Sequence, residues 1–290
     1  MRQDCCMRID LHTHSCVSDG TDTPTQLVRK AAAEGLDVIG LTDHDTFDGL
    51  REAKVAASSA GIVVLPGIEM SCQLDGASVH LLGYGCDPHF EPLLDELALV
   101  RVGRSGRLPE VLAKLNELGM PLTEAEIAQQ VGASPSLGRP HVADAMVAKG
   151  YVTSRQEAFD SFLHEGGPAY ASRYSCDIRR GIALVRRASG VPVIAHPWGR
   201  GRDRELTEAK LSELVMEYRL EGVEVDHPDH SAETRAKLRP LAERLGLLQL
   251  GSSDHHGHGK VNHELACETT AVEVYDEIVR RIKSRGGQLH

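Results

Sequence analysis

The chain has 290 residues, of which 41% are hydrophobic and 26% are charged, so it has enough apolar material for a large globular core. This composition excludes a disordered or collagen-like chain. The 42 acidic and 32 basic side chains give a formal net charge of −10, and only 4% of the residues are aromatic. A broad surface for duplex nucleic acid is therefore not expected, although a local group of cations can still bind a small anionic substrate.

The sequence also bears on location. No apolar run approaches the roughly 20 residues that span a bilayer, and residues 1–7 contain no stretch long enough for a signal peptide. The seven cysteines are an odd number and lack paired spacing apart from the adjacent Cys5 and Cys6. We therefore expect a cytoplasmic protein with no membrane attachment. No feature of the sequence indicates an oligomeric state.

Short β-branched segments alternate with longer helical patterns, which is typical of βα units that form a parallel sheet or a barrel. A first helix is expected between Thr23, which can cap it, and Gly35, and a second helix at 48–60. The predicted strands are 7–12, 37–42, 62–69, 78–84, 191–196, 222–226 and 247–252. Seven strands with their helices favour an α/β barrel over an open sheet, while periodicity alone leaves closure open.

The strand pattern is interrupted between residues 96 and 169, where the sequence is helical in period. We predict a helical cap inserted between the fourth and fifth strands, over the barrel mouth. Extra helices packed on the outside of the barrel are the alternative. The chain would then divide into a first barrel part at 7–95, the cap at 96–169 and a second barrel part at 170–290.

Three arginines of this segment, Arg101, Arg104 and Arg107, share one helix face. We expect this face to be a solvated, salt-bridged surface. If it instead lined the inner side of the cap, it would favour an extended or multiply phosphorylated substrate.

The strongest local signal is His12-Thr13-His14. Side chains at i and i+2 project from one face of a strand, so both imidazoles can reach one cation. Similar side chains recur at or near the ends of other predicted strands: Asp43, His44, Asp45, Glu69, His80, His196, Asp254 and His256. Because βα barrels form their active sites at the C-terminal ends of the strands, we expect a metal centre there.

The donor set consists of imidazoles and carboxylates without a thiolate. This set suits zinc, manganese or iron and disfavours a closed structural zinc site. We expect two or three divalent ions bridged by carboxylates, because one ion cannot use all nine candidate ligands: His12, His14, Asp19, His44, Glu69, His80, His196, Asp254 and His256. Such ions clamp the oxygens in a displacement at phosphorus and lower the pKa of a shared water. Since the sequence has no Gly-x-Ser-x-Gly motif and no P-loop, attack by a metal-bound hydroxide is the expected mechanism.

Together these segments resemble the PHP family (polymerase and histidinol phosphatase), and most closely its stand-alone metal-dependent phosphoesterases, which include 3′,5′-nucleotide bisphosphate phosphatases. The resemblance extends from residue 7 to about residue 281. Six motifs carry it: His12-Thr13-His14 with Asp19, Thr42-Asp43-His44-Asp45, Gly67-Ile68-Glu69, Val79-His80-Leu81-Leu82-Gly83-Tyr84, Ala195-His196-Pro197 and Ser253-Asp254-His255-His256. It implies a distorted seven-stranded (β/α)7 barrel with a helical insertion.

The resemblance also implies three ion sites that share ligands. The first would use His12, His14, Glu69 and Asp254. Glu69 would bridge to the second site, which would be completed by His80 and His196. The third would use Asp19, His44 and His256, although some relatives carry His in place of Asp19. His255 falls at the variable position of its motif and is not expected to bind an ion.

Substrate contacts are expected in the cap and beside the barrel. Gly138-Arg139-Pro140-His141 begins a helix, and a helix N-terminus with an arginine is suited to an anion. Relatives with a similar segment use it near the phosphate, so Arg139 and His141 are candidates. The alternative for Arg139 is a solvated surface side chain. Arg173 is a second phosphate candidate. His227 and His230, after the sixth strand, are candidate general acids, with a metal-bound water as the alternative.

The resemblance and the donor set together predict a metal-dependent phosphatase that hydrolyses a phosphomonoester of a small metabolite. A nucleotide is the expected substrate, either a 3′,5′-nucleoside bisphosphate or an AMP-like compound. A 5′–3′ exonuclease acting on short oligonucleotides by the same chemistry is one alternative. An amidohydrolase acting on a C–N bond is another, since such enzymes also carry His-x-His, but no strand-like segment here contains the bridging lysine that they often use. A metal sensor without enzymatic activity is the third alternative.

Overall fold

The computed structural model describes residues 7–131 and 138–289. Its strands are β1 Ile9–Thr13, β2 Val38–Leu41, β3 Val63–Leu74, β4 Ala77–Tyr84, β5 Cys176–Asp177, β6 Val191–Ala195, β7 Gly222–Asp226 and β8 Leu248–Gly251. They form one sheet in the order β1-β2-β3-β4-β6-β7-β8, with the short β5 paired to β3. A bridge between Thr13 and His255 joins the two edges, so the sheet is a nearly closed barrel. The predicted seven-stranded α/β barrel is confirmed.

The fourth strand departs from the parallel arrangement expected of βα units. β3 continues five residues beyond its predicted end, and the chain then reverses at Asp75 and Gly76, whose φ angles are 52° and 89°. Two residues with positive φ form the type I′ hairpin turn, which Asp-Gly favours. β4 therefore runs antiparallel to both β3 and β6. Its first half, with His80, lies at the barrel mouth, because His80 pairs with Ser71 and Ala195.

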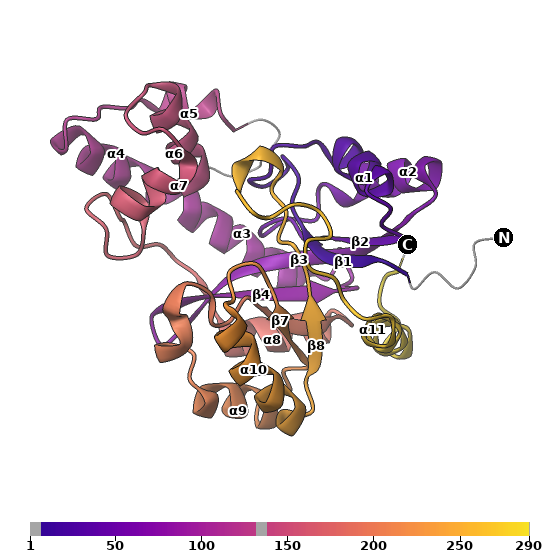
Figure 1. Ribbon diagram of the computed structural model, residues 1–290. Coiled ribbons are helices and arrows are strands. Elements are labelled where there is room, and N and C mark those ends of the chain that lie inside the picture. The colour runs from indigo at the N-terminus through magenta and orange to yellow at the C-terminus, as the bar shows by residue number, and fades with distance from the viewer. Residues whose placement is uncertain (1–6, 132–137, 290) are drawn as a thin grey trace.

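Helices surround the barrel (Figure 1). Those that follow or flank the strands are α1 Pro24–Ala33, α2 Leu50–Ala60, α3 Glu91–Gly106, α8 Ile178–Arg187, α9 Glu208–Met216, α10 Ala232–Leu245 and α11 Val272–Ser284. Thr23 caps α1 in a reciprocal arrangement with Gln26, and Gly61 ends α2 with a φ of 73°, as predicted. The helix α8 buries Ile178, Ile182 and other apolar residues of one face against the sheet.

Apolar side chains fill the barrel interior below the mouth. One cluster joins Ile9, Leu11 and Leu82 to apolar residues of β6, β8 and α11. Tyr84 is fully buried there, and its hydroxyl donates a hydrogen bond of 3.1 Å to the carbonyl of Leu11. Because burial of each large apolar side chain contributes about 1.5–3 kcal/mol, this interior is a rigid base for the polar groups above it.

A second group of helices lies to one side of the barrel, at the upper left of Figure 1. It contains α4 Leu108–Glu117, α5 Glu124–Ala128, α6 Arg139–Ala148, α7 Arg155–Ala158 and the π-helical turn Phe159–Leu163. Their apolar residues form a cluster of their own, whereas Leu93, Leu97 and Val100 of α3 pack into the barrel cluster. The division of the chain at residues 96 and 169 stays a prediction, and these contacts group most of α3 with the barrel.

Two further observations concern the residues that the structure describes. None of their helices combines the length and apolar character needed to cross a bilayer. Within this part of the chain no disulfide bond joins the cysteines, which are Cys16, Cys72, Cys86, Cys176 and Cys267. Cys5 and Cys6 lie outside the described residues.

Candidate metal centre

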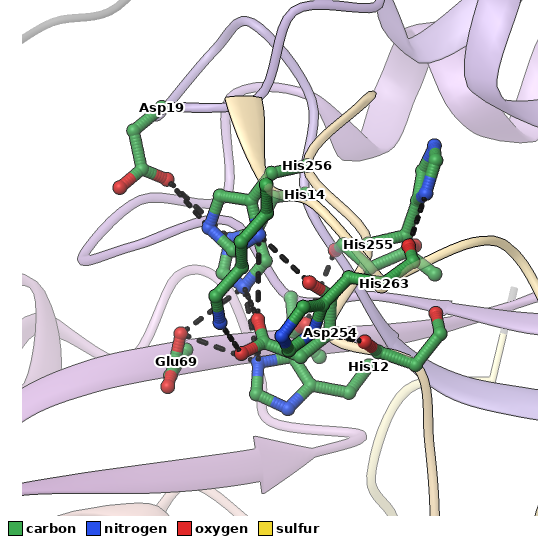
Figure 2. A network of polar contacts seen from close by, with 12 residues as sticks. His12, His14, Asp19, Glu69, Asp254, His255, His256 and His263 are labelled. Carbon is green, nitrogen blue, oxygen red and sulfur yellow. Dashed lines mark hydrogen bonds and ion pairs between the residues drawn. The ribbon is translucent and has the colours of Figure 1, made fainter. Parts of the chain in front are cut away.

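The nine predicted ligands meet at the barrel mouth, and Figure 2 labels six of them, with Glu69 and Asp254 facing the imidazoles. All are buried except His80 and His196, whose side chains are 21% and 12% exposed. Three of them lie in the strands β1, β3 and β4, namely His12, Glu69 and His80. The other six lie in the loops that follow β1, β2, β6 and β8: His14, Asp19, His44, His196, Asp254 and His256.

The first predicted ion site is a compact group of four side chains. The Nε2 atoms of His12 and His14 lie 3.0 Å apart. Glu69 Oε2 lies 3.3 and 3.1 Å from these two atoms, and Asp254 Oδ1 lies 3.5 and 3.4 Å from them. Two imidazole nitrogens and two carboxylate oxygens therefore face one point, which is a donor set that suits a divalent transition metal.

The second predicted site uses the other oxygen of Glu69. His80 Nδ1 lies 2.8 Å and His196 Nε2 lies 3.3 Å from Glu69 Oε1. The two oxygens of this carboxylate thus face two different groups of nitrogens. This geometry suits the bridging role that the resemblance implies for Glu69, and that role stays a prediction.

The third predicted site lies around Asp19. His256 Nε2 is 3.3 Å from Asp19 Oδ1, and His44 Nε2 is 3.7 Å from Asp19 Oδ2. His14 Nδ1 also approaches this carboxylate, at 3.8 Å. The other ring nitrogen of His44, Nδ1, is buried and lies 3.2 Å from Glu69 Oε2, and it makes no hydrogen bond among the residues that the structure describes. A buried ring nitrogen left in this state fits a cation.

Unusual backbone geometry turns several strand ends into the mouth. Asp45, His196 and Asp254 have φ angles of 56°, 29° and 52°. Such angles are rare for residues other than glycine and cost on the order of 1–3 kcal/mol each. Local hydrogen bonds hold them: the backbone N–H of His196 donates to Glu224 Oε2 at 2.8 Å, and Asp45 Oδ1 accepts from the backbone N–H of Ser71 at 2.7 Å.

The outer imidazoles of the centre are neutral. Burial lowers the pKa of His44 and of His196 to about 3, and that of His256 to about 4. Imidazole binds a metal in its neutral form, so these three side chains are prepared to act as ligands at physiological pH.

The carboxylates of the centre are ionised. Burial alone would raise the pKa of Asp254, but the ammonium group of Lys260 and the facing imidazoles hold it well below its usual value. The pKa of Glu69 is lowered in the same way by the surrounding histidines. Burial acts against the charge of His14 as well, yet its hydrogen bonds with Asp254 and Glu69 raise its pKa to about 9. A bound cation would replace that proton.

Asp43 and Asp45, which follow β2, do not join these groups. Asp43 accepts hydrogen bonds from the backbone and hydroxyl of Ser15 and from the hydroxyl of Ser18, at 2.7–2.8 Å. It therefore fixes the loop that carries Asp19. Asp45 forms an ion pair of 2.9 Å with Arg104. The sequence analysis missed Lys260 and Glu224, both of which contact predicted ligands.

A cavity of about 1160 Å³ lies above the centre. Residues of the barrel and of the cap both line it, so the cap faces the mouth. The expectation that Arg101, Arg104 and Arg107 form a solvated surface was wrong for the last two. Arg104 and Arg107 are only 7% and 8% exposed and line the cavity, because α3 lies between the barrel and the cap. Burial and the neighbouring Arg139 and Arg173 lower the pKa of Arg107.

The structure brings the three predicted substrate contacts to this cavity: Arg139, His141 and Arg173. The guanidinium of Arg139 lies 5.6 and 5.5 Å from the ring centres of Phe159 and Tyr170 and donates to the carbonyl of Leu163. His141 Nδ1 accepts a hydrogen bond from the backbone of Gly138, which places the proton of the neutral ring on Nε2. Burial lowers the pKa of Arg173 to about 10.

The two predicted general acids are placed differently. His227 and His230 are 0% and 3% exposed and are absent from the lining of the cavity. His227 Nδ1 accepts from the backbone N–H of Asp229, and its Nε2 lies 3.4 Å from Asp254 Oδ2. His230 Nδ1 donates to the carbonyl of Val225. Their role as acids stays a prediction, and the geometry shows no contact between them and the cavity.

The chain is similar to several known proteins. The PHP domain family matches residues 10–126. A 3′,5′-nucleoside bisphosphate phosphatase of Chromobacterium violaceum is 31% identical over 280 residues, which are 96% of this chain and 97% of that protein. A 5′-3′ exoribonuclease of Haemophilus influenzae is 30% identical over 252 residues, covering 86% of this chain and 90% of that protein.

A solved structure from Bifidobacterium adolescentis, named for the metal-dependent phosphoesterases, matches with a TM-score of 0.88 and 34% identity. The match covers 95% of this chain and 96% of that one. Both the sequence and the whole barrel with its cap therefore align with this group. The chain belongs to the PHP domain family and is a metal-dependent phosphoesterase.

Proposed function

We propose that this protein is a phosphatase that hydrolyses a phosphomonoester of a small nucleotide bearing a second phosphate, of the 3′,5′-nucleoside bisphosphate kind. The observation that carries the proposal is the unequal charge of the cavity. Its floor is the metal centre, and its wall contains Arg107, Arg139 and Arg173. A substrate with phosphates at both ends matches both regions.

The arginines of the wall are suited to bind an anion. Arg107, Arg139 and Arg173 form no ion pair with any carboxylate in the described part of the chain, although Arg107 is only 8% exposed. Buried cations without a partner are costly, and a phosphate can accept two parallel hydrogen bonds from one guanidinium. A relative of this chain bears the name of a nucleoside bisphosphate phosphatase, which supports the same substrate class.

The metal ligands and the substrate-binding side chains have different roles in the proposed reaction. Two or three divalent ions, manganese, zinc or iron, held by the nine ligands would supply positive charge for the phosphoryl oxygens and a water of lowered pKa. The guanidinium of Arg139 and the Nε2–H of His141 would orient the substrate from the cap. Arg107 and Arg173 would hold its second anionic group, so that the phosphoester lies over the floor.

The direct test compares hydrolysis of 3′,5′-adenosine bisphosphate, AMP and nitrophenyl phosphate, each with manganese or zinc. We expect phosphate release from all three and the highest kcat/KM for the bisphosphate. Equal kcat/KM for the bisphosphate and nitrophenyl phosphate would contradict the proposal, because the wall would then contribute nothing.

The exonuclease alternative is retained because a relative is a 5′-3′ exoribonuclease and the cavity is large enough for more than one nucleotide. Product lengths from an end-labelled short oligonucleotide separate the two functions. We propose that the protein acts on small or single-stranded substrates rather than on duplex nucleic acid, since the net charge is −10. We also propose a cytoplasmic location, which free thiols such as Cys72 and Cys267 favour.

A further inference from the structure

One strand of the barrel, β7, contributes none of the nine predicted ligands. It instead places the carboxylate of Glu224 beneath them. Glu224 is fully buried, and β7 lies between β6 and β8 in the sheet. A buried carboxylate requires several donors to offset its lost hydration, so its partners indicate what it does.

Glu224 accepts three hydrogen bonds from three different segments. Its Oε1 atom lies 2.9 Å from His12 Nδ1 and accepts from the hydroxyl of Ser252 at 2.7 Å. Its Oε2 atom accepts from the backbone N–H of His196 at 2.8 Å. His12 belongs to β1, His196 follows β6, and Ser252 lies two residues before Asp254. One carboxylate therefore contacts the three segments that carry His12, His196 and Asp254.

The contact with His12 fixes the state of that imidazole. An ionised carboxylate can only accept, so His12 Nδ1 must donate. The neutral ring then has its lone pair on Nε2, which is the nitrogen that faces Glu69 and Asp254. Without Glu224, the other tautomer and other ring rotations become available, and both would take the lone pair away from the ion.

The contact with His196 fixes a strained turn. His196 has a φ of 29°, which a residue with a side chain adopts only when its surroundings hold it. The hydrogen bond from its backbone N–H to Glu224 supplies that support. The same turn directs the ring of His196 toward Glu69, at 3.3 Å.

We propose that Glu224 is a positioning residue of the metal centre: it sets the tautomer of His12 and holds the turns that carry His196 and Asp254. Its effect is on ion affinity. The proposal depends on the metal centre and is independent of which phosphoester the enzyme hydrolyses.

The test is the substitution Glu224→Gln, which preserves size. The amide has one oxygen in place of two, so its NH2 group must face either the N–H of His196 or both His12 and Ser252. In the first orientation two donors oppose each other, and in the second the NH2 group favours the tautomer of His12 that has its lone pair on Nδ1. We expect the affinity of the metal-free protein for zinc, measured by competition with a chromophoric chelator, to fall by about 10- to 100-fold. The visible spectrum of the cobalt-loaded protein should change as well.

The matched control is Glu221→Gln. Glu221 immediately precedes β7, is 8% exposed and forms ion pairs with Arg186, Arg281 and Arg285, but contacts no predicted ligand. We expect this variant to lower the unfolding temperature and to keep the wild-type zinc affinity. Equal loss of zinc affinity in both variants would overturn the proposal, as would wild-type zinc affinity in Glu224→Gln.

Glu224→Asp keeps the proposal testable if the Gln variant does not fold. It retains the negative charge but is one methylene shorter, so it cannot reach all three partners. Weakened zinc binding in the folded Asp variant supports positioning, whereas unchanged binding shows that the charge alone matters and overturns the proposal. Neither result depends on phosphatase activity, so failure here is distinct from failure of the proposed function.

Discussion

The floor and the wall of the cavity are built in opposite ways. The floor consists of imidazoles and carboxylates at strand ends, where each side chain contacts several others. The wall also contains carboxylates such as Asp144 and Glu165, but it gathers four arginines: Arg104, Arg107, Arg139 and Arg173. The last three have no carboxylate partner in the parts of the chain that the structure describes. The floor is thus arranged for cations and the wall for an anion. Turnover and substrate choice should therefore respond to different substitutions.

Glu69→Gln should produce the largest effect, because Glu69 faces two groups of ligands at once. We expect kcat/KM to fall by on the order of 10³-fold for every substrate, comparable to removing a group that stabilises transition-state charge. Bound metal, measured by elemental analysis after dialysis, should fall with it. The control is Gln73→Ala, on the same strand but outside these groups. Full metal content with unchanged turnover in Glu69→Gln would show that the floor is not the reaction centre.

Arg104→Met should have the next largest effect, since Arg104 connects wall and floor. It pairs with Asp45 at 2.9 Å and donates to the hydroxyl of Ser71 at 2.6 Å. Its loss leaves Asp45 buried without its cation, so we expect a fall of roughly 3–5 kcal/mol in unfolding free energy. Denaturant unfolding measures this value. The double variant with Asp45→Asn should recover much of the loss, and no recovery would mean that the pair is not the cause.

Arg107→Leu should separate the wall from the floor. A charge-assisted hydrogen bond contributes about 1.5–3 kcal/mol, so we expect KM for 3′,5′-adenosine bisphosphate to rise by roughly 10- to 100-fold. KM for nitrophenyl phosphate should change little. The exposed Arg51→Leu, on α2, is the control. A similar rise in KM for both substrates would indicate that Arg107 contacts the phosphate over the floor.

The sequence predicted the floor better than the wall for a physical reason. Strand ends of a barrel converge, so polar residues that follow apolar strands, such as Glu69 and His196, can be assigned to one place from the pattern alone. Charged residues on a helix usually face solvent, which led to the wrong expectation for Arg104 and Arg107. Their burial depends on the cap that covers α3, and no local pattern encodes that contact.

Two strands, β7 and β4, show what the sequence can and cannot predict. Val223 and Val225 alternate with Glu224, so period 2 places the carboxylate opposite the valines without telling which face is inside the barrel. The antiparallel direction of β4 was signalled by Asp75-Gly76, a hairpin dipeptide that the strand assignment passed over. Local turn chemistry was therefore readable, while the side of a strand that faces the interior was not.

Glu96→Gln should give the smallest effect. It tests whether a change on the outer side of α3 is transmitted to the cavity. Glu96 accepts hydrogen bonds of 2.6 Å from the hydroxyl of Tyr174 and from Nε of Arg180. Burial acts to raise the pKa of Glu96, but these bonds hold it below its usual value. A carboxyl with a lowered folded pKa stabilises the protein above its unfolded pKa of about 4.3 and loses this contribution as pH falls through the folded pKa.

The unfolding temperatures of wild type and Glu96→Gln should therefore differ at pH 7 and converge below about pH 4. The control is Glu110→Gln, since Glu110 is exposed and pairs with Lys114, and this variant should show no such convergence. A constant difference at every pH would mean that the lost contacts of Glu96 act through packing instead of charge.

The same variant also tests whether a change on the outer side of α3 reaches the cavity. Because Glu96 touches neither the floor nor the wall, unchanged zinc affinity and KM would show that the outer side of α3 and the cavity act independently. A change in either would show that α3 transmits a shift from its outer side to the cavity.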